Sequence, residues 1–119
     1  MASESERTMT TRTLAKAEWR TYFDRVAAGL QGKRASVEIT SEALGDQWAA
    51  RRLPLLGITY DDKDDLVEVA MDGVDHLVLH PDAIKIDEQA GGLACLEITA
   101  RDGTRQIVTL VDPVMLPAS

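Results

Sequence analysis

Apolar residues recur with a helical period most clearly in the first quarter of the chain. Between residues 14 and 30 they return every three or four positions, which places them on one face of an amphipathic helix. Thr13 is a suitable N-cap, and Gly29 or Gly32 can adopt the left-handed conformation that ends a helix. The apolar stripe, which is expected to fill the core, consists of Trp19, Tyr22, Phe23, Val26, Ala27 and Leu30.

After this helix the hydrophobic pattern changes to a period of two, which is typical of strands with one buried face. The alternating segments are short, rich in β-branched residues and separated by turn-forming residues. Asp72-Gly73 and Asp102-Gly103 favour two-residue type I′ hairpins. Six or seven strands are predicted, within residues 36–40, 55–60, 66–71, 74–80, 83–87, 93–100 and 106–111.

These elements predict an α+β fold. An N-terminal amphipathic helix is expected to pack on a strongly curled, barrel-like antiparallel sheet of six or seven short strands. Curling is expected because an open flat sheet of so many strands would leave a bare edge and an uncovered face. One domain is predicted over residues 13–112, with a disordered tail at 1–12 and a second tail at 113–119.

Composition narrows the class of protein. The chain has 119 residues, enough for one core, and no apolar run near the roughly 20 residues that cross a bilayer, so no membrane partner is expected. Its one cysteine, Cys95, cannot form an internal disulfide, and residues 1–12 lack the apolar part of a signal peptide. A cytoplasmic location is therefore predicted.

Charge is unevenly distributed. The net charge is −7, but residues 1–34 contain seven basic and four acidic residues, whereas residues 35–119 contain six and sixteen. An acidic body repels phosphate backbones, so no nucleic-acid partner is expected. The two adjacent basic pairs, Lys33-Arg34 and Arg51-Arg52, are interpreted as solvated surface.

Candidate metal ligands are interpreted as structural. His76 and His80 lie on one predicted strand, where their side chains would be about 13 Å apart, too far for one metal ion. In the predicted hairpin Val69 faces His76, and Asp65 faces His80 as a cross-strand ion pair. The acidic run 61–65 lacks the glycine and distal glutamate of a calcium loop and is interpreted as a solvated turn. No metal or cofactor is expected.

Candidate catalytic groups are also few. Cys95 lies in an apolar strand without a basic neighbour, which predicts an inert, half-buried thiol. The chain contains no nucleophile elbow, phosphate-binding loop or dinucleotide fingerprint, and no catalytic residue is assigned.

The stretch from Ala43 to Trp48, continuing through Arg51-Arg52 to Asp61, includes most of the longest predicted connection between regular elements, residues 41–54, and loops often carry function. It combines residue types that are common at binding hot spots. The candidate interaction surface consists of Asp46, Gln47, Trp48, Arg51 and Arg52. In the alternative interpretation, Trp48 and Leu53 cover the end of the barrel while the arginines offset the acidic body.

Several motifs of the chain resemble one family. They are A-L-G-D-Q at 43–47, P-L-L-G-I-T-Y-D at 54–61, D-H-L-V-L-H-P at 75–81, D-G-T-R-Q-I-V at 102–108 and a closing L-P. Together with the tryptophan-containing helix they resemble a family of short bacterial proteins known only as a domain of unknown function. The resemblance covers residues 14–117 and implies a bacterial single-domain protein, with no catalytic residue or ligand to carry over.

Three functions are compared. The leading hypothesis is a non-enzymatic module that acts through contacts with another protein or with a second copy of itself. The alternative is a small-ligand-binding protein or minor hydrolase, with a pocket at the barrel mouth lined by Asp46, Gln47 and a histidine. Nucleic-acid binding on a small barrel is disfavoured by the acidic body.

Overall fold

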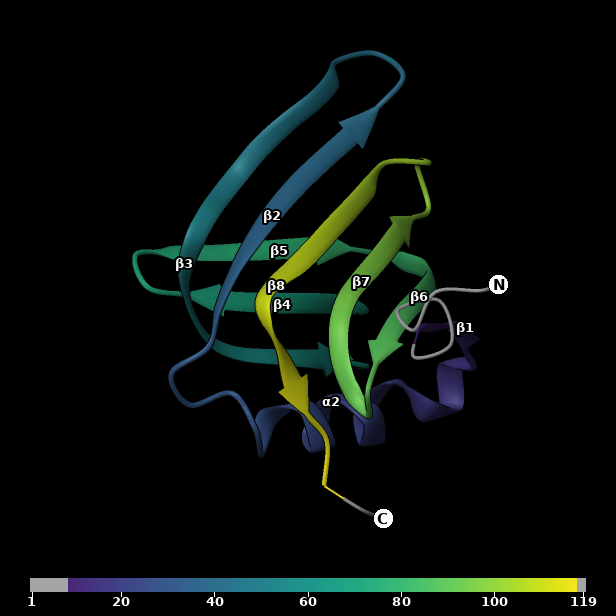
Figure 1. The fold of residues 1–119 in the computed structure, drawn as a ribbon. Coiled ribbons are helices and arrows are strands. Elements are labelled where there is room, and N and C mark those ends of the chain that lie inside the picture. Colours follow the sequence, from purple (N-terminus) through teal and green to yellow (C-terminus); the bar gives the residue numbers. More distant parts are fainter. Residues whose placement is uncertain (1–8, 118–119) are drawn as a thin grey trace, which may run out of the picture.

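The computed structural model describes residues 9–117, and most of them lie in strands. Strand β1 (Met9–Leu14) is the first described element, and the 3-10 turn η1 (Lys16–Glu18) leads into helix α2 (Trp19–Ala27). Seven more strands follow along the chain (Figure 1). They are β2 (Arg34–Ser41), β3 (Gly45–Asp61), β4 (Leu66–Met71), β5 (Val74–Leu79), β6 (Pro81–Gln89), β7 (Gly92–Ala100) and β8 (Arg105–Met115).

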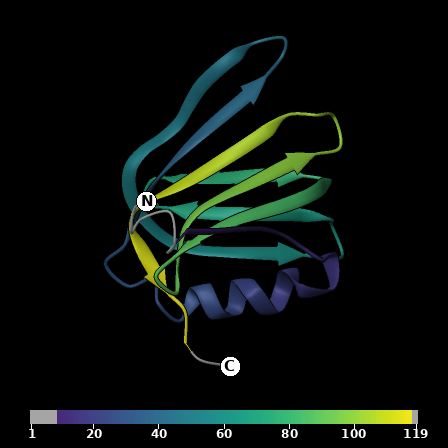
Figure 2. The same cartoon turned by 45° about the vertical axis from the view of Figure 1, so that its right-hand side comes forward.

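The strands form one antiparallel sheet in the order β1-β6-β7-β8-β2-β3-β4-β5. Strand β3 belongs to two parts of this sheet, because residues 45–54 pair with β2 and residues 55–61 pair with β4. The register shifts at a bulge between Leu55 and Gly57, where the strand changes partner. Figures 1 and 2 show β4 and β5 crossing the long strands β2, β8 and β7 at a steep angle. The sheet therefore has two arms that are joined through β3. One arm consists of β1, β6, β7, β8, β2 and the first half of β3, and the other consists of the second half of β3, β4 and β5.

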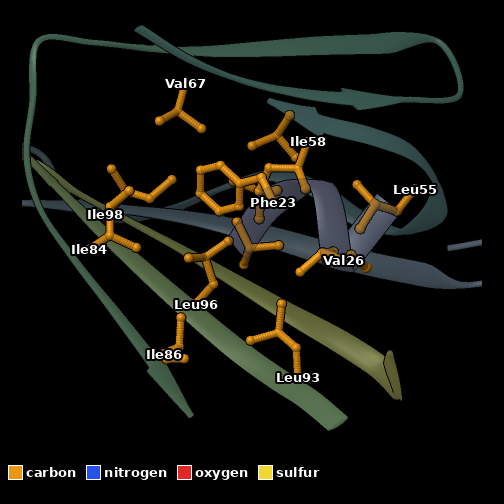
Figure 3. Close-up of a cluster of buried hydrophobic side chains, with 14 of the residues drawn as sticks. Phe23, Val26, Leu55, Ile58, Val67, Ile84, Ile86, Leu93, Leu96 and Ile98 are labelled. Carbon is orange, nitrogen blue, oxygen red and sulfur yellow. The ribbon is translucent and has the colours of Figure 1, made fainter. Parts of the chain in front are cut away.

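Both arms and the helix share one core. The buried face of α2 consists of Trp19, Tyr22, Phe23 and Val26. In Figure 3, Phe23 lies between Ile58 of β3 on one side and Leu96 of β7 on the other. The Tyr22 hydroxyl donates a hydrogen bond of 2.8 Å to Glu88, which fixes the helix to β6. The interpretation of the stripe as core is confirmed for its three aromatic residues, Val26 and Leu30, whereas Ala27 is exposed.

The predicted fold class is wrong in three respects. The sheet is neither closed nor curled into a barrel, since β1 and β5 lie at its two edges and do not pair with each other. Eight strands are described instead of six or seven. The helix is short and follows a strand. Closure is unnecessary because each arm covers the apolar face of the other across the shared core.

The helix begins later than its hydrophobic pattern suggested. Leu14 is buried as the last residue of β1, opposite Ile84, and Ala15 has an extended backbone. The Glu18 carboxylate accepts a hydrogen bond of 2.9 Å from the Ala15 N–H, which satisfies a donor at the start of the helical segment. Neither Thr13 nor a left-handed glycine caps α2, whose C-cap is Ala28.

The hairpin predictions are partly confirmed. Met71 lies opposite Val74, so Asp72 and Gly73 form a two-residue loop, but only Gly73 has a positive φ, 79°. A type I′ turn requires positive φ at both positions and is therefore excluded. The loop at Asp102 and Gly103 is longer, because the Ala100 N–H donates to the Thr104 carbonyl.

Strands extend into both segments that were expected to be tails, residues 1–12 and 113–119. Strand β1 begins at Met9, and β8 continues to Met115. Residues 1–8 and 118–119, which belong to the segments expected to be tails, lie outside the described residues. Among residues 9–117, no helix has the length and apolar character needed to cross a bilayer.

Candidate functional site

The predicted connection is a strand, which corrects its interpretation as a loop. A tight turn after Ser41 sends the chain directly into β3, helped by Gly45 with a φ of 71° and by the Ser41 hydroxyl, which accepts the Leu44 N–H at 3.1 Å. Asp46 then lies opposite Thr40, and Trp48 lies opposite Glu38. The β2–β3 hairpin extends beyond the neighbouring β7–β8 hairpin (Figure 1).

Trp48 is displayed and does not cover the core. Its side chain is 52% exposed, and the exposed Leu44 lies at the hairpin tip nearby. The Arg51 guanidinium stands over the Trp48 ring, 4.8 Å from the ring centroid, in a cation–π contact. A bulge between these strands allows this, because Ala50 opposite Val37 is buried while Trp48 is not. Of the two residues proposed as a cover, only Leu53 packs against the core.

Three basic residues lie on the β2–β3 strand pair, and a fourth, Lys33, immediately precedes β2, where its carbonyl oxygen accepts the Leu55 N–H at 2.9 Å. Arg34 begins β2 opposite Pro54, and Arg51 and Arg52 come shortly before Pro54 in β3. Arg52 has a φ of 53°, and its N–H donates a hydrogen bond of 2.9 Å to the Ser36 hydroxyl, which anchors the bulge. We call Lys33, Arg34, Trp48, Arg51 and Arg52 the ribbon surface.

The four cations of the ribbon surface form no ion pair with a described residue. Arg12, Lys16, Arg20, Arg101 and Arg105 do pair with carboxylates, whereas Arg25, Lys63 and Lys85 also lack an ion pair with a described residue. The four cations of the ribbon surface differ from these three because they lie close together along one strand pair. The ribbon surface therefore carries unneutralised positive charge on a chain whose net charge is −7. The pattern of the sequence suggests Trp48, Arg51 and Arg52 from one segment, whereas Lys33 and Arg34 join them only through the β2–β3 pairing.

A shallow depression adjoins the ribbon surface. It holds about 440 Å³ between the end of α2 and β3. Leu30, Pro54 and Leu56 supply apolar lining, while Lys33 and Arg34 supply positive charge. Its chemistry is that of a site for an apolar group next to an anionic one.

The pocket of the alternative hypothesis lacks support. Asp46 and Gln47 are exposed near the hairpin tip. His76 contacts Gln106 and His80 contacts Asp65. Five surface depressions of about 230 to 450 Å³ are lined by other residues. Nothing among them brings Asp46, Gln47 and a histidine together.

The histidines occupy the predicted hairpin. Val69 lies opposite His76, as predicted, and Nε2 of His76 lies 2.6 Å from Oε1 of Gln106 in the other arm. Nδ1 of His80 lies 3.4 Å from an Asp65 carboxylate oxygen, which confirms the predicted cross-strand pair. Within residues 9–117, no three metal-binding side chains cluster.

The acidic segment 61–65 forms the turn between β3 and β4, as predicted. The Asp61 carboxylate accepts the backbone N–H groups of Lys63 and Asp64, at 2.9 and 3.3 Å. Asp65 lies at the end of this turn and also accepts a hydrogen bond of 2.9 Å from the Tyr60 hydroxyl. These contacts assign the segment a structural role.

The cysteine is also as predicted. The Cys95 side chain is partly buried on β7, and burial raises the pKa of its thiol. A raised pKa keeps the thiol protonated and poorly nucleophilic at neutral pH. Cys95 therefore does not supply an activated thiolate.

The fold and the ribbon surface define a small β-rich protein with one described helix and an exposed pair of strands that carries a tryptophan and unpaired cations. The chain belongs to the family of unknown function DUF5335, whose sequence profile matches residues 10–119. This confirms the resemblance to uncharacterised bacterial proteins. A relative from Aquifex aeolicus (strain VF5), named "Uncharacterized protein", is 34% identical over 110 residues, which cover 92% of this chain and 99% of that protein. No solved structure matches the chain.

Proposed function

We propose that the protein is a non-catalytic module that binds an acidic surface of another protein through the ribbon surface. The observation that carries this proposal is the group of four cations without an ion-pair partner among the described residues, of which Arg51 stacks on the exposed Trp48. Charged side chains in a folded protein gain little from pairing at the surface, but an opposite charge on a partner speeds encounter and fixes its orientation. Tryptophan and arginine are the residue types that most often dominate binding energy.

The carboxylates on the ribbon favour a protein partner over a nucleic acid. Glu38 lies directly opposite Trp48, and Asp46 lies opposite Thr40 two residues farther along β2. A phosphate backbone that contacts Trp48 and Arg51 would approach these carboxylates on a chain of net charge −7. An acidic protein surface can instead place its own donors against Glu38 and its carboxylates against the arginines.

The stacking of Arg51 on Trp48 supports tight binding. Holding both side chains in one arrangement before binding reduces the entropy that is lost when a partner docks. Removing such a central residue commonly costs at least about 2 kcal/mol of binding free energy, or roughly thirtyfold in Kd. The depression beside Lys33 and Arg34 extends the contact with apolar lining.

Quantitative affinity capture from cells that naturally make the protein tests this proposal. The bait carries Trp48→Ala with Arg51→Ala, and the matched control carries Lys63→Ala, a basic side chain in the acidic turn. A partner of the ribbon surface should be lost from the double variant and kept by the control. The captured protein is then purified, and its Kd should rise at least about thirtyfold for the double variant.

Three results would contradict the proposal. Equal capture by both baits would place the contact elsewhere. Binding of a single-stranded RNA oligonucleotide at physiological salt, lost in the double variant, would make the ribbon a nucleic-acid site. Association of purified protein with itself, lost in the same variant, would make a second copy the partner.

A further inference from the structure

The outer edge of β5 is open. Among the strands of residues 9–117, β5 pairs only with β4 and is the last strand of the sheet. A two-residue hairpin loop is closed by a hydrogen-bonded pair, here Met71 and Val74, and hydrogen-bonded pairs then recur at every second residue. The His80 N–H donates to the Asp65 carbonyl at 2.8 Å. His80 and Asp65 each lie six residues, an even number, from Val74 and Met71, so this bond fits the pattern.

Alternate residues of β5 therefore present their backbone groups away from β4. The N–H and C=O groups of Asp75, Leu77 and Leu79 point to the free side, and no described backbone group pairs with them. Leu77 and Leu79 are 48% and 58% exposed. The edge thus combines unpaired backbone groups with apolar side chains.

Other free edges of the sheet carry protection that β5 lacks. The free half of β3 contains register shifts, Arg51, Arg52 and Pro54, and these are devices that prevent a further strand from pairing. Strand β1 presents threonines and Arg12. Strand β5 has no bulge, proline, lysine or arginine. An unprotected edge with exposed leucines is suited to pairing with an added strand.

Charge indicates the chemistry of that strand. Asp75 lies next to Glu68 on the outer face, diagonally across the β4–β5 pair. A hydrogen bond and repulsion between the two carboxyl groups raise the pKa of Glu68, and neither group forms an ion pair with a described residue. A cation opposite Asp75 would relieve this repulsion.

We propose that the free edge of β5 binds an extended segment of a partner protein as an additional strand, with apolar side chains beside Leu77 and Leu79 and a lysine or arginine beside Asp75. This site goes beyond the proposed function, because it lies on the other arm of the sheet from the ribbon surface. The hydrogen bonds of the added strand supply general affinity, and the side chains of β5 supply selectivity.

Amide hydrogen exchange measured by NMR tests the proposal with a capped synthetic peptide of alternating valine and lysine. In the free protein the amides of Asp75, Leu77 and Leu79 should exchange fast, while those of His76 and Val78 should be slow. At about 90% occupancy the three fast amides should exchange about tenfold more slowly. A peptide of the same composition with its valines and lysines in two blocks should leave them unchanged, as should one of alternating valine and glutamate.

Two variants identify the edge as the site. Leu77→Pro removes a donor that points away from β4, so it should abolish peptide protection and leave the β4–β5 bonds in place. Asp75→Asn should weaken binding of the lysine peptide, whereas Asp64→Asn in the acidic turn should not. Should Leu77→Pro fold poorly, Leu77→Lys blocks the edge by charge.

Equal binding of alternating and blocked peptides, or peptide binding without protection of the three amides, would overturn the proposal. Protection that rises with protein concentration in the absence of peptide would also overturn it, in favour of a second copy of the chain. The Trp48→Ala, Arg51→Ala double variant should bind the peptide normally. The two proposed surfaces can therefore fail separately.

Discussion

Asp65 connects parts of the chain that are distant in sequence. Its carboxylate accepts the Tyr60 hydroxyl and lies 3.4 Å from His80, 3.8 Å from Arg101 and 4.0 Å from Lys16. The hydrogen bond from Tyr60, supported by His80 and Lys16, holds the pKa of Asp65 below its ordinary value. The hairpin pattern of the sequence predicts the His80 contact, but Lys16 and Arg101 approach Asp65 only in the folded molecule.

Replacing Asp65 with Asn should destabilise the protein in a pH-dependent manner. Because the carboxyl has a lower pKa in the folded state than its ordinary 3.8, its ionisation stabilises the fold above pH 3.8, and this stabilisation is lost as pH falls through the folded-state pKa. Chemical denaturation should show the largest difference between wild type and Asp65→Asn near neutral pH and a shrinking difference below pH 3.8. A stability difference between the two proteins that does not change with pH would mean that the substitution acts through packing or hydrogen-bond geometry and not through the charge of Asp65.

The two tryptophans show how far local pattern can be trusted. Trp19 belongs to a helical stripe and is 2% exposed, as its periodicity predicts. Trp48 lies two residues before the buried Ala50, so regular alternation would place both side chains on the same face. Trp48 is on the outer face because a bulge interrupts the alternation. Its role as a candidate contact could be suggested from residue type alone, but its exposure could not.

At the scale of elements, close packing of α2 against β8 explains a glycine. A Cβ built on Gly29 would lie 2.5 Å from the Met115 carbonyl oxygen and 3.1 Å from a Val114 methyl group. The Arg25 guanidinium also donates to the Pro117 carbonyl at 3.1 Å. The C-terminal part of the described chain is therefore fitted to the end of the helix.

Gly29→Ala should destabilise the protein by about 1–3 kcal/mol, because backbone must move to admit the methyl group. Gly57→Ala is the matched control, since no atom of the described residues lies within 4 Å of a Cβ at that position. The control should be neutral or stabilising by up to about 1 kcal/mol. Equal effects of the two substitutions in urea denaturation would show that the helix and β8 separate easily.

The predicted boundaries of an element agree with the structure only where its pairing partners are close in the sequence. β4 was predicted without error at both ends, because its alternation and its two-residue loop are encoded within one hairpin. β1 was missed, since its threonine-rich pattern has no clear apolar face and it pairs with β6 about 75 residues away by the register of Thr11 with Asp87. The N-terminal half of β3, residues 45–54, was missed because bulges break the period.

At the scale of the molecule, β3 makes the two arms one unit. Its first half pairs with β2 and its second half with β4, and the core cluster includes residues from both arms. The hydrogen bond between His76 and Gln106 adds a polar contact between β5 and β8. Separating the arms would expose the apolar face of each, so partial unfolding is costly.

The whole described body should therefore unfold in one cooperative step. In a Trp48→Phe variant, Trp19 is the remaining tryptophan, and its fluorescence reports on the helix and the core. Urea unfolding monitored by this fluorescence should coincide with unfolding monitored by far-UV circular dichroism, which reports mainly on the sheet. Two separate transitions would show that the arms unfold independently.

The sequence by itself determined the buried aromatic stripe, the β-rich remainder, the β4–β5 hairpin and the structural acidic turn, because each depends on residues near one another in the chain. It also determined the family resemblance, which rests on the identity of residues along the chain and needs no tertiary contact. Only the tertiary structure decided the open sheet, the exposure of Trp48 and the gathering of Lys33 and Arg34 with Arg51 and Arg52. Strand partners and bulges decide these features, and they follow from the free energy of packing the whole core, which no local pattern contains.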